Sequence, residues 1–259
     1  MSFLQIEDVT HSYFSKQSKT TALIDVSLTI EEGEFISFLG PSGCGKTTLL
    51  SIISGLIHPT IGRVIIDHEE VHDSNNKTGY MLQQDYLFPW RTIEDNILLG
   101  LRLTKQLNVK TKQKTIALLE EMGLKHVLKQ FPTQLSGGMR QRVALVRTLA
   151  TNPKLLLLDE PFSALDFQTK LKLEDLVFAT LKQFQKTAIL VTHDIGEAIA
   201  MSDRIYLFSN RPGTIHKIFD ISAELKSLTP FRARNHELYN HTFQEIWKEL
   251  ESLEQTNEN

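Results

Sequence analysis

Glycines, a lysine and two threonines lie together near the start of the chain, in the stretch Gly40-Pro-Ser-Gly-Cys-Gly-Lys46-Thr-Thr. This stretch fits the phosphate-binding pattern G-x-x-x-x-G-K-[ST], with a short apolar run before it and a helical pattern after it. Glycines let the backbone curl so that successive N–H groups face phosphate oxygens, and the following helix adds the positive end of its dipole. We therefore expect nucleotide phosphates to bind here, with Lys46 at the β- and γ-phosphates and the Thr47 hydroxyl on Mg²⁺. The residues expected to contact the nucleotide are Gly40, Pro41, Ser42, Gly43, Cys44, Gly45, Lys46, Thr47 and Thr48.

Two acids end a later apolar run, Leu155–Leu158, and are good candidates for the chemistry itself. Asp159 is expected to hold Mg²⁺. Glu160, one residue on, is expected to polarise the attacking water as a general base. Alone, such a run is better interpreted as a core strand ending in solvated acids. After a phosphate-binding loop, we favour the catalytic interpretation.

A second potential anion site is Leu135-Ser136-Gly137-Gly138, directly before a helical pattern. Ser136 could simply cap the helix, because serine is a favoured N-cap residue. A hydroxyl, free N–H groups and a helix dipole also form an anion site. Since the chain already has one phosphate loop, this second one makes sense if it serves the nucleotide of another copy.

Composition excludes several classes of protein. The chain has 259 residues with a formal net charge of -3, which argues against a nucleic-acid partner. Its single cysteine, Cys44, cannot form an intramolecular disulfide, which fits a reducing compartment. Beside Lys46 at a helix start, Cys44 is either reactive toward alkylation or a small residue chosen for fit. The N-terminal residues do not resemble a signal peptide and no apolar run could span a bilayer, so we expect membrane work to need another chain.

The pattern of apolar residues predicts strands interrupted by helices. Strands are expected at 3–9, 23–30, 35–39, 154–158, 187–191, 205–209 and 214–219, and helices at 47–56, 92–103, 112–122, 139–150 and 167–185. Strands alternating with helices favour an α/β domain with a mainly parallel sheet. The alternation of residues 23–30 indicates a half-covered antiparallel strand.

We predict an ATP-binding domain over residues 1–225, with a helical subdomain at about 88–151. A helical tail is predicted over residues 226–259. In the tail, an apolar stripe of Tyr239, Phe243, Ile246, Leu250 and Leu253 indicates an amphipathic helix. We favour packing of this helix on its own domain over binding of a partner, and leave open whether the tail is regulatory or only structural.

The order of these motifs, followed by Thr192-His193-Asp194, resembles the nucleotide-binding domains of ABC ATPases over about residues 1–220. The resemblance implies the P-loop NTPase fold, an α/β sandwich with an antiparallel β subdomain and a helical subdomain. It also implies that Tyr13 stacks on adenine and that His193 contacts the γ-phosphate. Gln83, or its neighbour Gln84, would sense Mg²⁺ and water; we prefer Gln83 by its distance to Pro89-Trp90. Asp166 would cross the interface of a dimer.

Further loops resemble importer ATPases for nitrate, sulfonate, taurine and thiamine-pyrimidine precursors. These are residues 87–97, the Leu-Ser-Gly-Gly-Met-Arg-Gln-Arg stretch and residues 210–214. The resemblance implies ATP and Mg²⁺ as cofactors, and membrane permease subunits, a second copy of the chain and, indirectly, an extracytoplasmic solute-binding protein as partners. The aromatic segment 86–90 would then dock a helix of the permease. The implied location is the cytoplasmic face of the cell membrane, as a peripheral subunit.

Two other functions compete with this one. Soluble ABC ATPases of DNA repair or translation usually carry tandem domains or long coiled coils, and this chain has neither. A regulatory subunit would bind nucleotide without hydrolysing it, but Glu160 and His193 argue against that role.

Overall fold

A six-stranded sheet carries the phosphate loop in the computed structural model, which describes residues 2–16, 18–74, 77–163 and 165–255. The strand order is β10 (Ile215–Asp220), β9 (Arg204–Phe208), β3 (Phe35–Leu39), β8 (Thr187–Thr192), β7 (Leu155–Asp159), β6 (Thr78–Met81). All pair in parallel except β10, which is antiparallel to β9. Every residue of β3, β7 and β8 is buried, as expected for parallel strands covered on both faces. The carboxyl ends of these strands therefore meet at one edge, which is where α/β sheets bind ligands.

A smaller antiparallel sheet lies beside it, with the order β2 (Lys19–Ile30), β1 (Leu4–Phe14), β4 (Ile61–Ile66), β5 (Glu69–Glu70). Helix α1 (Lys46–Ile53) follows the phosphate loop. Its buried Leu49, Leu50, Ile52 and Ile53 join one hydrophobic core with residues of both sheets. This shared core fixes the start of α1 against β3, so the intervening loop has little freedom.

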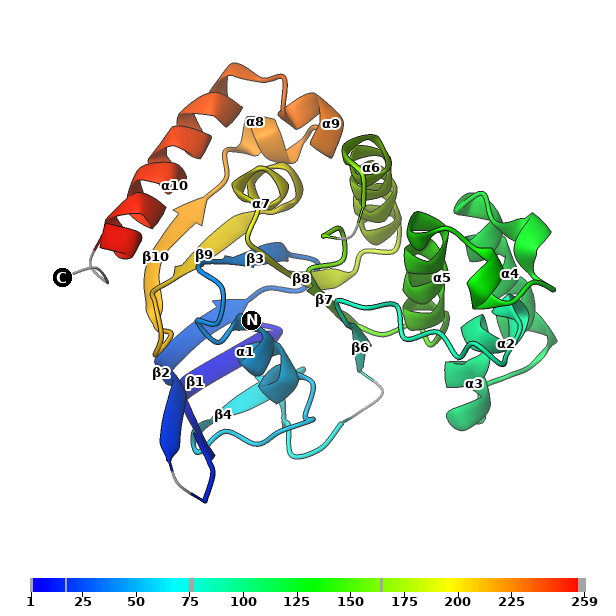
Figure 1. Cartoon of the computed structure of the whole chain (residues 1–259), viewed down its shortest axis with the longest axis horizontal. Helices are drawn as coiled ribbons and strands as arrows, with labels where there is room; N and C mark the ends of the chain where they lie inside the picture. Colours follow the sequence, from blue (N-terminus) through cyan, green and yellow to red (C-terminus); the bar gives the residue numbers. More distant parts are fainter. Residues whose placement is uncertain (1, 17, 75–76, 164, 256–259) are drawn as a thin grey trace.

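Four helices form a lobe at one side of the molecule (Figure 1). They are α2 (Ile93–Ile97), α3 (Leu99–Leu103), α4 (Val109–Glu121) and α5 (Gly137–Ala150), with 3₁₀ turns at Lys125–Val127 and Pro132–Gln134. The lobe shares a second core with β6, β7, β8 and α6 (Phe167–Gln183). This core ties the start of α5, with Ser136, to the sheet.

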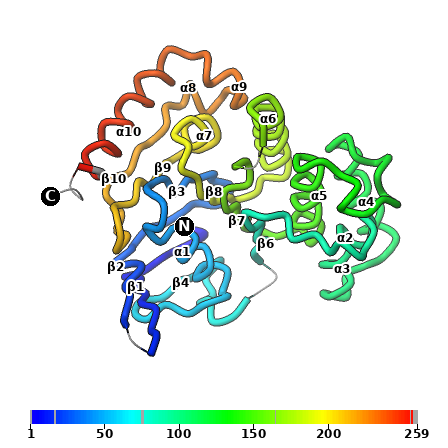
Figure 2. Tube along the Cα trace, in the orientation of Figure 1, coloured from blue at the N-terminus to red at the C-terminus, as the bar shows by residue number. Residues whose placement is uncertain are grey.

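The tail folds back over the β10 edge of the six-stranded sheet, at the opposite side from the helical lobe (Figure 2). Helices α8 (Ala223–Lys226), α9 (Pro230–Ala233) and α10 (Glu237–Gln255) pack with α7 (Ile195–Met201), β9 and β10 in a third core. The predicted stripe faces this core: Ile246 and Leu253 are buried, and Tyr239, Phe243 and Leu250 pack against it. None of the helices in the described parts of the chain is long and apolar enough to cross a membrane.

The fold departs from the predicted elements in several places, and the short helices α7, α8 and α9 were not predicted. The helix predicted at 92–103 is two short helices that meet at Leu98, and the buried Asn96 side chain fixes the start of the first by bonding the carbonyls of Phe88, Arg91 and Thr92. Strands β1 and β2 are longer than predicted, since their polar ends pair as a hairpin. Strands β4, β5 and β6 were not predicted; β6 is short and contains Gly79, where a Cβ would lie 2.7 Å from the Pro153 ring.

Candidate functional site

The phosphate loop between β3 and α1 needs glycine at two positions. Gly40 has φ 152° and Gly45 has φ 108°, a region that L side chains rarely adopt. A Cβ at Gly40 would also lie 2.9 Å from the carbonyl of Phe208, and one at Gly45 would lie 2.8 Å from that of Ala22. The loop is thus pressed against its neighbours and its shape excludes side chains at these points.

Lys46 stabilises the curled loop from inside. Its ammonium donates to the carbonyl oxygens of Gly40 at 2.7 Å and Pro41 at 2.8 Å, and the side chain is almost completely buried. The Cys44 sulfur lies 3.5 Å from the same ammonium. A buried cation with these neutral partners is well suited to attract an anion at the same point. The loop therefore presents positive charge as well as N–H groups.

The loop forms one wall of a cavity of about 560 Å³ at the carboxyl ends of the strands. The cavity brings together most of the residues that the sequence predicts for the site. They are Tyr13, Ser42, Gly43, Gly45, Lys46, Thr47, Thr48, Gln83, Glu160 and His193, joined by Ala22, Val191 and Arg211. Seven separate segments of the chain thus converge on one space.

Asp159 lies at the end of β7, where its side chain meets the first turn of α1. The Thr47 hydroxyl donates to Oδ1 of Asp159 at 3.1 Å, and the Tyr80 hydroxyl lies 3.5 Å from Oδ2. Burial, with the nearby Glu160 charge, raises the pKa of the Asp159 carboxyl above its usual range. The two oxygens of Thr47 and Asp159 thus form a compact pair of hard donors.

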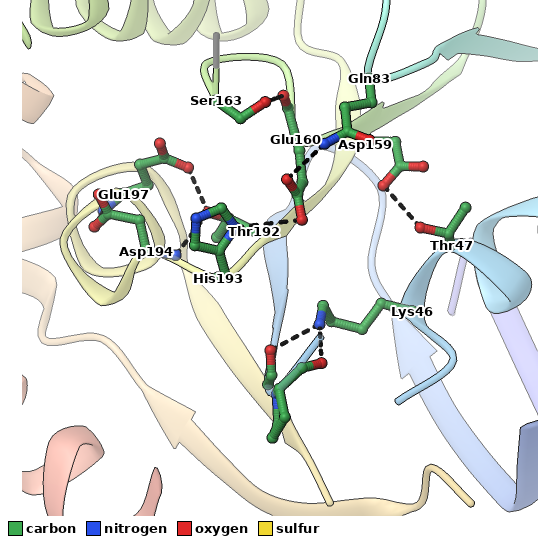
Figure 3. Close-up of polar contacts among 12 residues, drawn as sticks. Lys46, Thr47, Gln83, Asp159, Glu160, Ser163, Thr192, His193, Asp194 and Glu197 are labelled. Carbon is green, nitrogen blue, oxygen red and sulfur yellow. Dashed lines mark hydrogen bonds and ion pairs between the residues drawn. The ribbon is translucent and has the colours of Figure 1, made fainter. Parts of the chain in front are cut away.

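Glu160 follows Asp159 and lines the cavity. Figure 3 shows its side chain between those of Gln83 and His193. Its backbone is left-handed, with φ 46°, and its N–H donates to the carbonyl of Val191 at 2.9 Å. The side-chain amide of Gln83 donates to Oε2 of Glu160 at 3.0 Å, and Nδ1 of His193 lies 3.3 Å from Oε1. A carboxylate is therefore held between an amide and an imidazole beside the phosphate loop, which is a suitable position for a general base.

The residues behind His193 fix the start of α7. The Asp194 side chain caps the helix at the Glu197 N–H at 3.1 Å, and the Asp194 N–H donates to the Thr192 hydroxyl at 3.0 Å. Lys170 of α6 lies 2.7 Å from Asp194 and also forms an ion pair with Glu197. Although burial opposes it, this pairing with Lys170 lowers the pKa of the Asp194 carboxyl.

Four predicted residues lie away from this cavity. Ser136 caps α5 by accepting from the Met139 N–H at 3.4 Å, followed by Gly137 and Gly138, and Asp166 caps α6 by accepting from the Thr169 N–H at 3.0 Å. A Cβ at Gly138 would lie 2.9 Å from the Thr169 side chain. The starts of α5 and α6 are therefore neighbours, separate from the phosphate loop of the same chain.

The structure also separates two pairs of alternatives. Gln83 lines the cavity, whereas the exposed Gln84 does not. For Cys44, burial argues against the reactive alternative, because the residue is only 1% exposed and belongs to the same hydrophobic core as Leu49 and Leu50. A thiol enclosed in this way fits the alternative of a small residue chosen for size.

Sequence reasoning missed the contribution of residues 210–214. Arg211 lines the cavity, and Gly213 lies so close to the loop that a Cβ would be 2.0 Å from the Cys44 carbonyl. The Gly213 N–H donates to Ala22 and its carbonyl accepts from Ile24, which holds the segment under the phosphate loop. The sequence predicts a turn at Arg211-Pro212-Gly213, but no pattern in the sequence indicates which segment this turn contacts.

A larger cavity, of about 810 Å³, lies elsewhere, lined by residues that include Glu32, Phe35, Lys186 and Asp203. It opens where β3 and β8 begin, at the opposite end from the phosphate loop. We assign the site to the smaller cavity because ligands of such sheets bind at the carboxyl ends of the strands.

The glycine loop between a buried strand and a helix, with Lys46 in the loop and Asp159 at the end of β7, two strands along the sheet, defines a P-loop nucleotide-binding protein. The family model described as ABC transporter matches residues 23–163. The chain is 63% identical to the ABC transporter ATP-binding protein YtlC of Bacillus subtilis, over 100% of both chains. It is 41% identical to the aliphatic sulfonates import ATP-binding protein SsuB of Bacillus licheniformis, over 95% of this chain and 94% of that one.

Other comparisons agree. The taurine import ATP-binding protein TauB of Pelagibacter ubique is 44% identical over 77% of this chain and 76% of its own. The dimeric ATP-binding cassette MJ0796, solved in a post-hydrolysis state bound to ADP and Pi, superposes with a TM-score of 0.75 at 34% identity, covering 85% of this chain and 99% of that one. The chain therefore belongs to the ABC transporter family as an ATP-binding subunit. It is an ATPase with the P-loop fold of that family.

Proposed function

We propose that this ATPase energises the import of a small solute of the nitrate, sulfonate, taurine or pyrimidine-precursor type through a partner permease. The observation that carries the hydrolytic part is the Glu160 carboxylate, held by Gln83 and His193 in the lining of the phosphate-loop cavity. The import part is supported by the similarity to SsuB and TauB. The permease would hold the chain at the cytoplasmic face of the membrane, and an extracytoplasmic binding protein would deliver the solute.

The assignment of roles follows the arrangement of the cavity. Lys46 would bind the β- and γ-phosphates, since its ammonium lies inside the loop. Tyr13 would stack on adenine, because its half-exposed ring lies at the cavity edge, with its hydroxyl 3.2 Å from that of Thr48. Glu160 would act as general base, with Gln83 and His193 orienting its carboxylate and contacting water and the γ-phosphate.

Mg²⁺ fits the donors present beside the loop. Among the described residues, no group of three His, Cys, Asp or Glu side chains could hold a metal ion alone. Mg²⁺ is usually bound by only one or two protein carboxylates, with phosphate oxygens and waters as its other ligands. The 3.1 Å pair of Thr47 and Asp159, with Gln83 nearby, suits that mode. The ion would neutralise phosphate charge, and removing it with a chelator should abolish hydrolysis until Mg²⁺ is restored.

Two copies would share each nucleotide. Ser136, Gly137 and Gly138 of one copy would face the γ-phosphate held by Lys46 of the other, and Asp166 would cross the interface. In support, these residues lie outside the cavity of their own chain, and the superposed cassette is a dimer. We also propose the division into an ATP-binding domain over 1–225, with the helical subdomain at 88–151, and a tail over 226–259.

Mixing two inactive variants tests this arrangement. A Lys46→Ala chain loses its own loop, and a Ser136→Arg chain places a bulky cation against the nucleotide of its partner. A heterodimer of the two has one site with both defects and one site with neither. Recovery of ATPase activity in the mixture supports shared sites. No recovery, together with no ATP-dependent crosslink between Ser42→Cys and Ser136→Cys chains, would contradict them.

A non-hydrolysing regulatory subunit is the competing function. It predicts nucleotide binding without release of phosphate. An ATPase assay on the purified chain, with Glu160→Gln as the control for contaminating activity, distinguishes the two functions directly.

A further inference from the structure

A second cavity, of about 480 Å³, lies between the phosphate loop and the tail helix α10. Ser42 and His193 line this cavity as well as the nucleotide cavity, so the two share a rim. Its opposite wall is made by Phe243, Trp247 and Leu250 of α10. Nucleotide binding explains the shared rim but leaves the aromatic wall without a role. We call this second space the tail cavity.

The wall of the tail cavity presents apolar surface that the chain itself does not cover. The rings of Phe243 and Trp247 are stacked, with centroids 6.3 Å apart and planes 12° apart. Trp247 remains 49% exposed, although the same helix buries Ile246 completely. Large aromatic surfaces left open beside a functional site commonly mark a place where another apolar group binds.

A candidate for that group is at the start of α6. Phe167 is the first residue of the helix, follows Asp166 directly, and is 70% exposed. It does not line the tail cavity of its own chain. A Cβ at Gly138 would lie 2.9 Å from Thr169 and 3.4 Å from Leu165, so the residues on either side of Phe167 pack beside the start of α5. Phe167 therefore stands on the same face as Ser136 and Asp166.

We propose that, in the ATP-bound dimer, Phe167 of each copy inserts into the tail cavity of the other. This inference rests on the shared sites of the proposed function, in which Ser136 of one copy faces the loop of the other at Ser42. Residues 166 and 167 are only about 3.8 Å apart at Cα. A chain that brings Asp166 across the interface thus brings Phe167 with it, to the rim at Ser42 where the tail cavity begins.

The contact would be made twice, because the interface of two identical copies is isologous. It continues the nucleotide interface outward, from the phosphate loop to α10. The tail helix would then be part of the ATP-dependent interface, and closure of the dimer would press on α10, which packs against α7 behind His193. The tail is in this view a partner-binding element as well as a cover for its own domain.

Crosslinking provides the test. Phe167→Cys and Trp247→Cys are combined in full-length Glu160→Gln chains, which should stay closed on ATP, and a short bifunctional thiol reagent is added. The expected result is a covalent dimer that forms with MgATP and not with ADP. The pair Ser42→Cys and Ser136→Cys reports the shared nucleotide site separately. Phe231→Cys replaces Phe167→Cys as the matched control, since Phe231 is also an exposed aromatic but lies on α9.

The outcomes separate the two proposals. If the Ser42–Ser136 pair crosslinks and the Phe167–Trp247 pair does not, the dimer stands and the inference is overturned. If neither pair crosslinks, the shared site fails and the inference fails with it. Crosslinking of Trp247→Cys to a permease chain in place of the second copy would also overturn it.

Dimer affinity gives a second measurement in the same Glu160→Gln background. Phe167→Ala and Trp247→Ala should each weaken ATP-dependent dimerisation about tenfold, the usual effect of losing a central aromatic contact. The combined variant should be little weaker than either single one, because both remove the same contact. Phe231→Ala should leave the affinity unchanged. Unchanged affinity in Phe167→Ala, or fully additive losses, would count against the contact.

Discussion

The side-chain amide of Gln83 donates a 3.0 Å hydrogen bond to the Glu160 carboxylate, although the two residues are 77 positions apart. His193 approaches the other oxygen of the same carboxylate at 3.3 Å. The backbone of Glu160 is fixed at the end of β7 by its bond to Val191. Three segments thus define where one acidic group points, and this arrangement leads to the first two predictions.

Replacing Glu160 by Gln should separate binding from hydrolysis. The variant keeps the size of the side chain but removes the base, while Lys46, Thr47 and Asp159 remain. We expect ATP and Mg²⁺ to bind and phosphate release to slow by roughly 10²–10⁴-fold. Gel filtration with ATP should show doubled mass, because the closed dimer persists. A rate close to that of the unaltered chain would remove Glu160 from the role of base.

The neighbouring glutamines offer a matched comparison. Gln83→Ala should slow phosphate release by about tenfold or more, because the Glu160 carboxylate loses its donor. Gln84→Ala should change the rate by less than about twofold, since Gln84 is exposed and lies outside the cavity. Steady-state kinetics at saturating ATP measures both. The reverse order of effects would transfer the sensing role to Gln84.

Sequence patterns located the strands that carry the site because those strands are short, apolar and followed at once by functional residues. The phosphate loop, Asp159 and Glu160 could be found in this way, since their geometry depends on adjacent residues. The contacts behind His193 could not. Lys170 reaches Asp194 and Glu197 only through the packing of α6 on α7, and no local pattern encodes that packing.

Cys44 illustrates the limit within the loop itself. Its position beside Lys46 and a helix start was visible in the sequence, but its burial depends on residues from β1, β2 and β9 in the same core. Exposure is a property of the folded surroundings and not of the neighbours in sequence. The tail stripe was the opposite case, because the helical period alone shows which face must be covered.

The buried thiol gives a prediction about labelling. At 1% exposure, Cys44 should react with a small alkylating reagent only when the loop opens. Labelling should therefore be slow in the folded chain and fast in denaturant. A Ser42→Cys variant, with a cysteine at an exposed loop position, should label much faster under native conditions. Mass spectrometry over time distinguishes the two sites. Equal native rates would show that the loop opens readily.

Glu174 gives a prediction about pH. Its side chain is fully buried in α6 and bonds Arg234 of the tail through both carboxylate oxygens. Burial raises the pKa of Glu174 to about 7, against the opposing effect of Arg234, from an ordinary value of 4.5. The folded state therefore holds a proton that the unfolded state has lost between these two pH values. The resulting contribution to stability is complete below pH 4.5 and is lost as the pH rises through about 7.

A Glu174→Gln variant removes this titration. Between pH 4.5 and 7, the free energy of unfolding of the unaltered chain should fall relative to the variant, by on the order of 1–3 kcal/mol. Urea unfolding at a series of pH values measures the difference. Glu121→Gln, at an exposed position on α4, controls for the loss of a carboxyl group. Parallel curves for the chain and the Glu174→Gln variant would contradict the raised pKa.

Trp90 provides the last prediction, which concerns the proposed permease. Its ring is 71% exposed and packs edge-on against Phe88, with centroids 5.4 Å apart. Arg147 of α5 holds the same segment by donating to the carbonyls of Tyr86 and Asp85 at 2.8 and 2.7 Å. A displacement of this segment by the permease would therefore be transmitted through Arg147 to α5, the helix that Ser136 caps.

Because Trp90 is exposed, Trp90→Ala should leave folding and the ATPase rate of the isolated subunit within about twofold of the unaltered values. In the assembled transporter, solute uptake should fall by about tenfold, since exposed aromatics are frequent anchors of interfaces. Phe131→Ala, at another exposed aromatic of the helical lobe, is the matched control and should change neither quantity. Uptake into vesicles and ATPase assays of the free subunit make the comparison. Equal losses of uptake and of isolated ATPase activity would assign Trp90 to packing within the lobe, and not to contact with the permease.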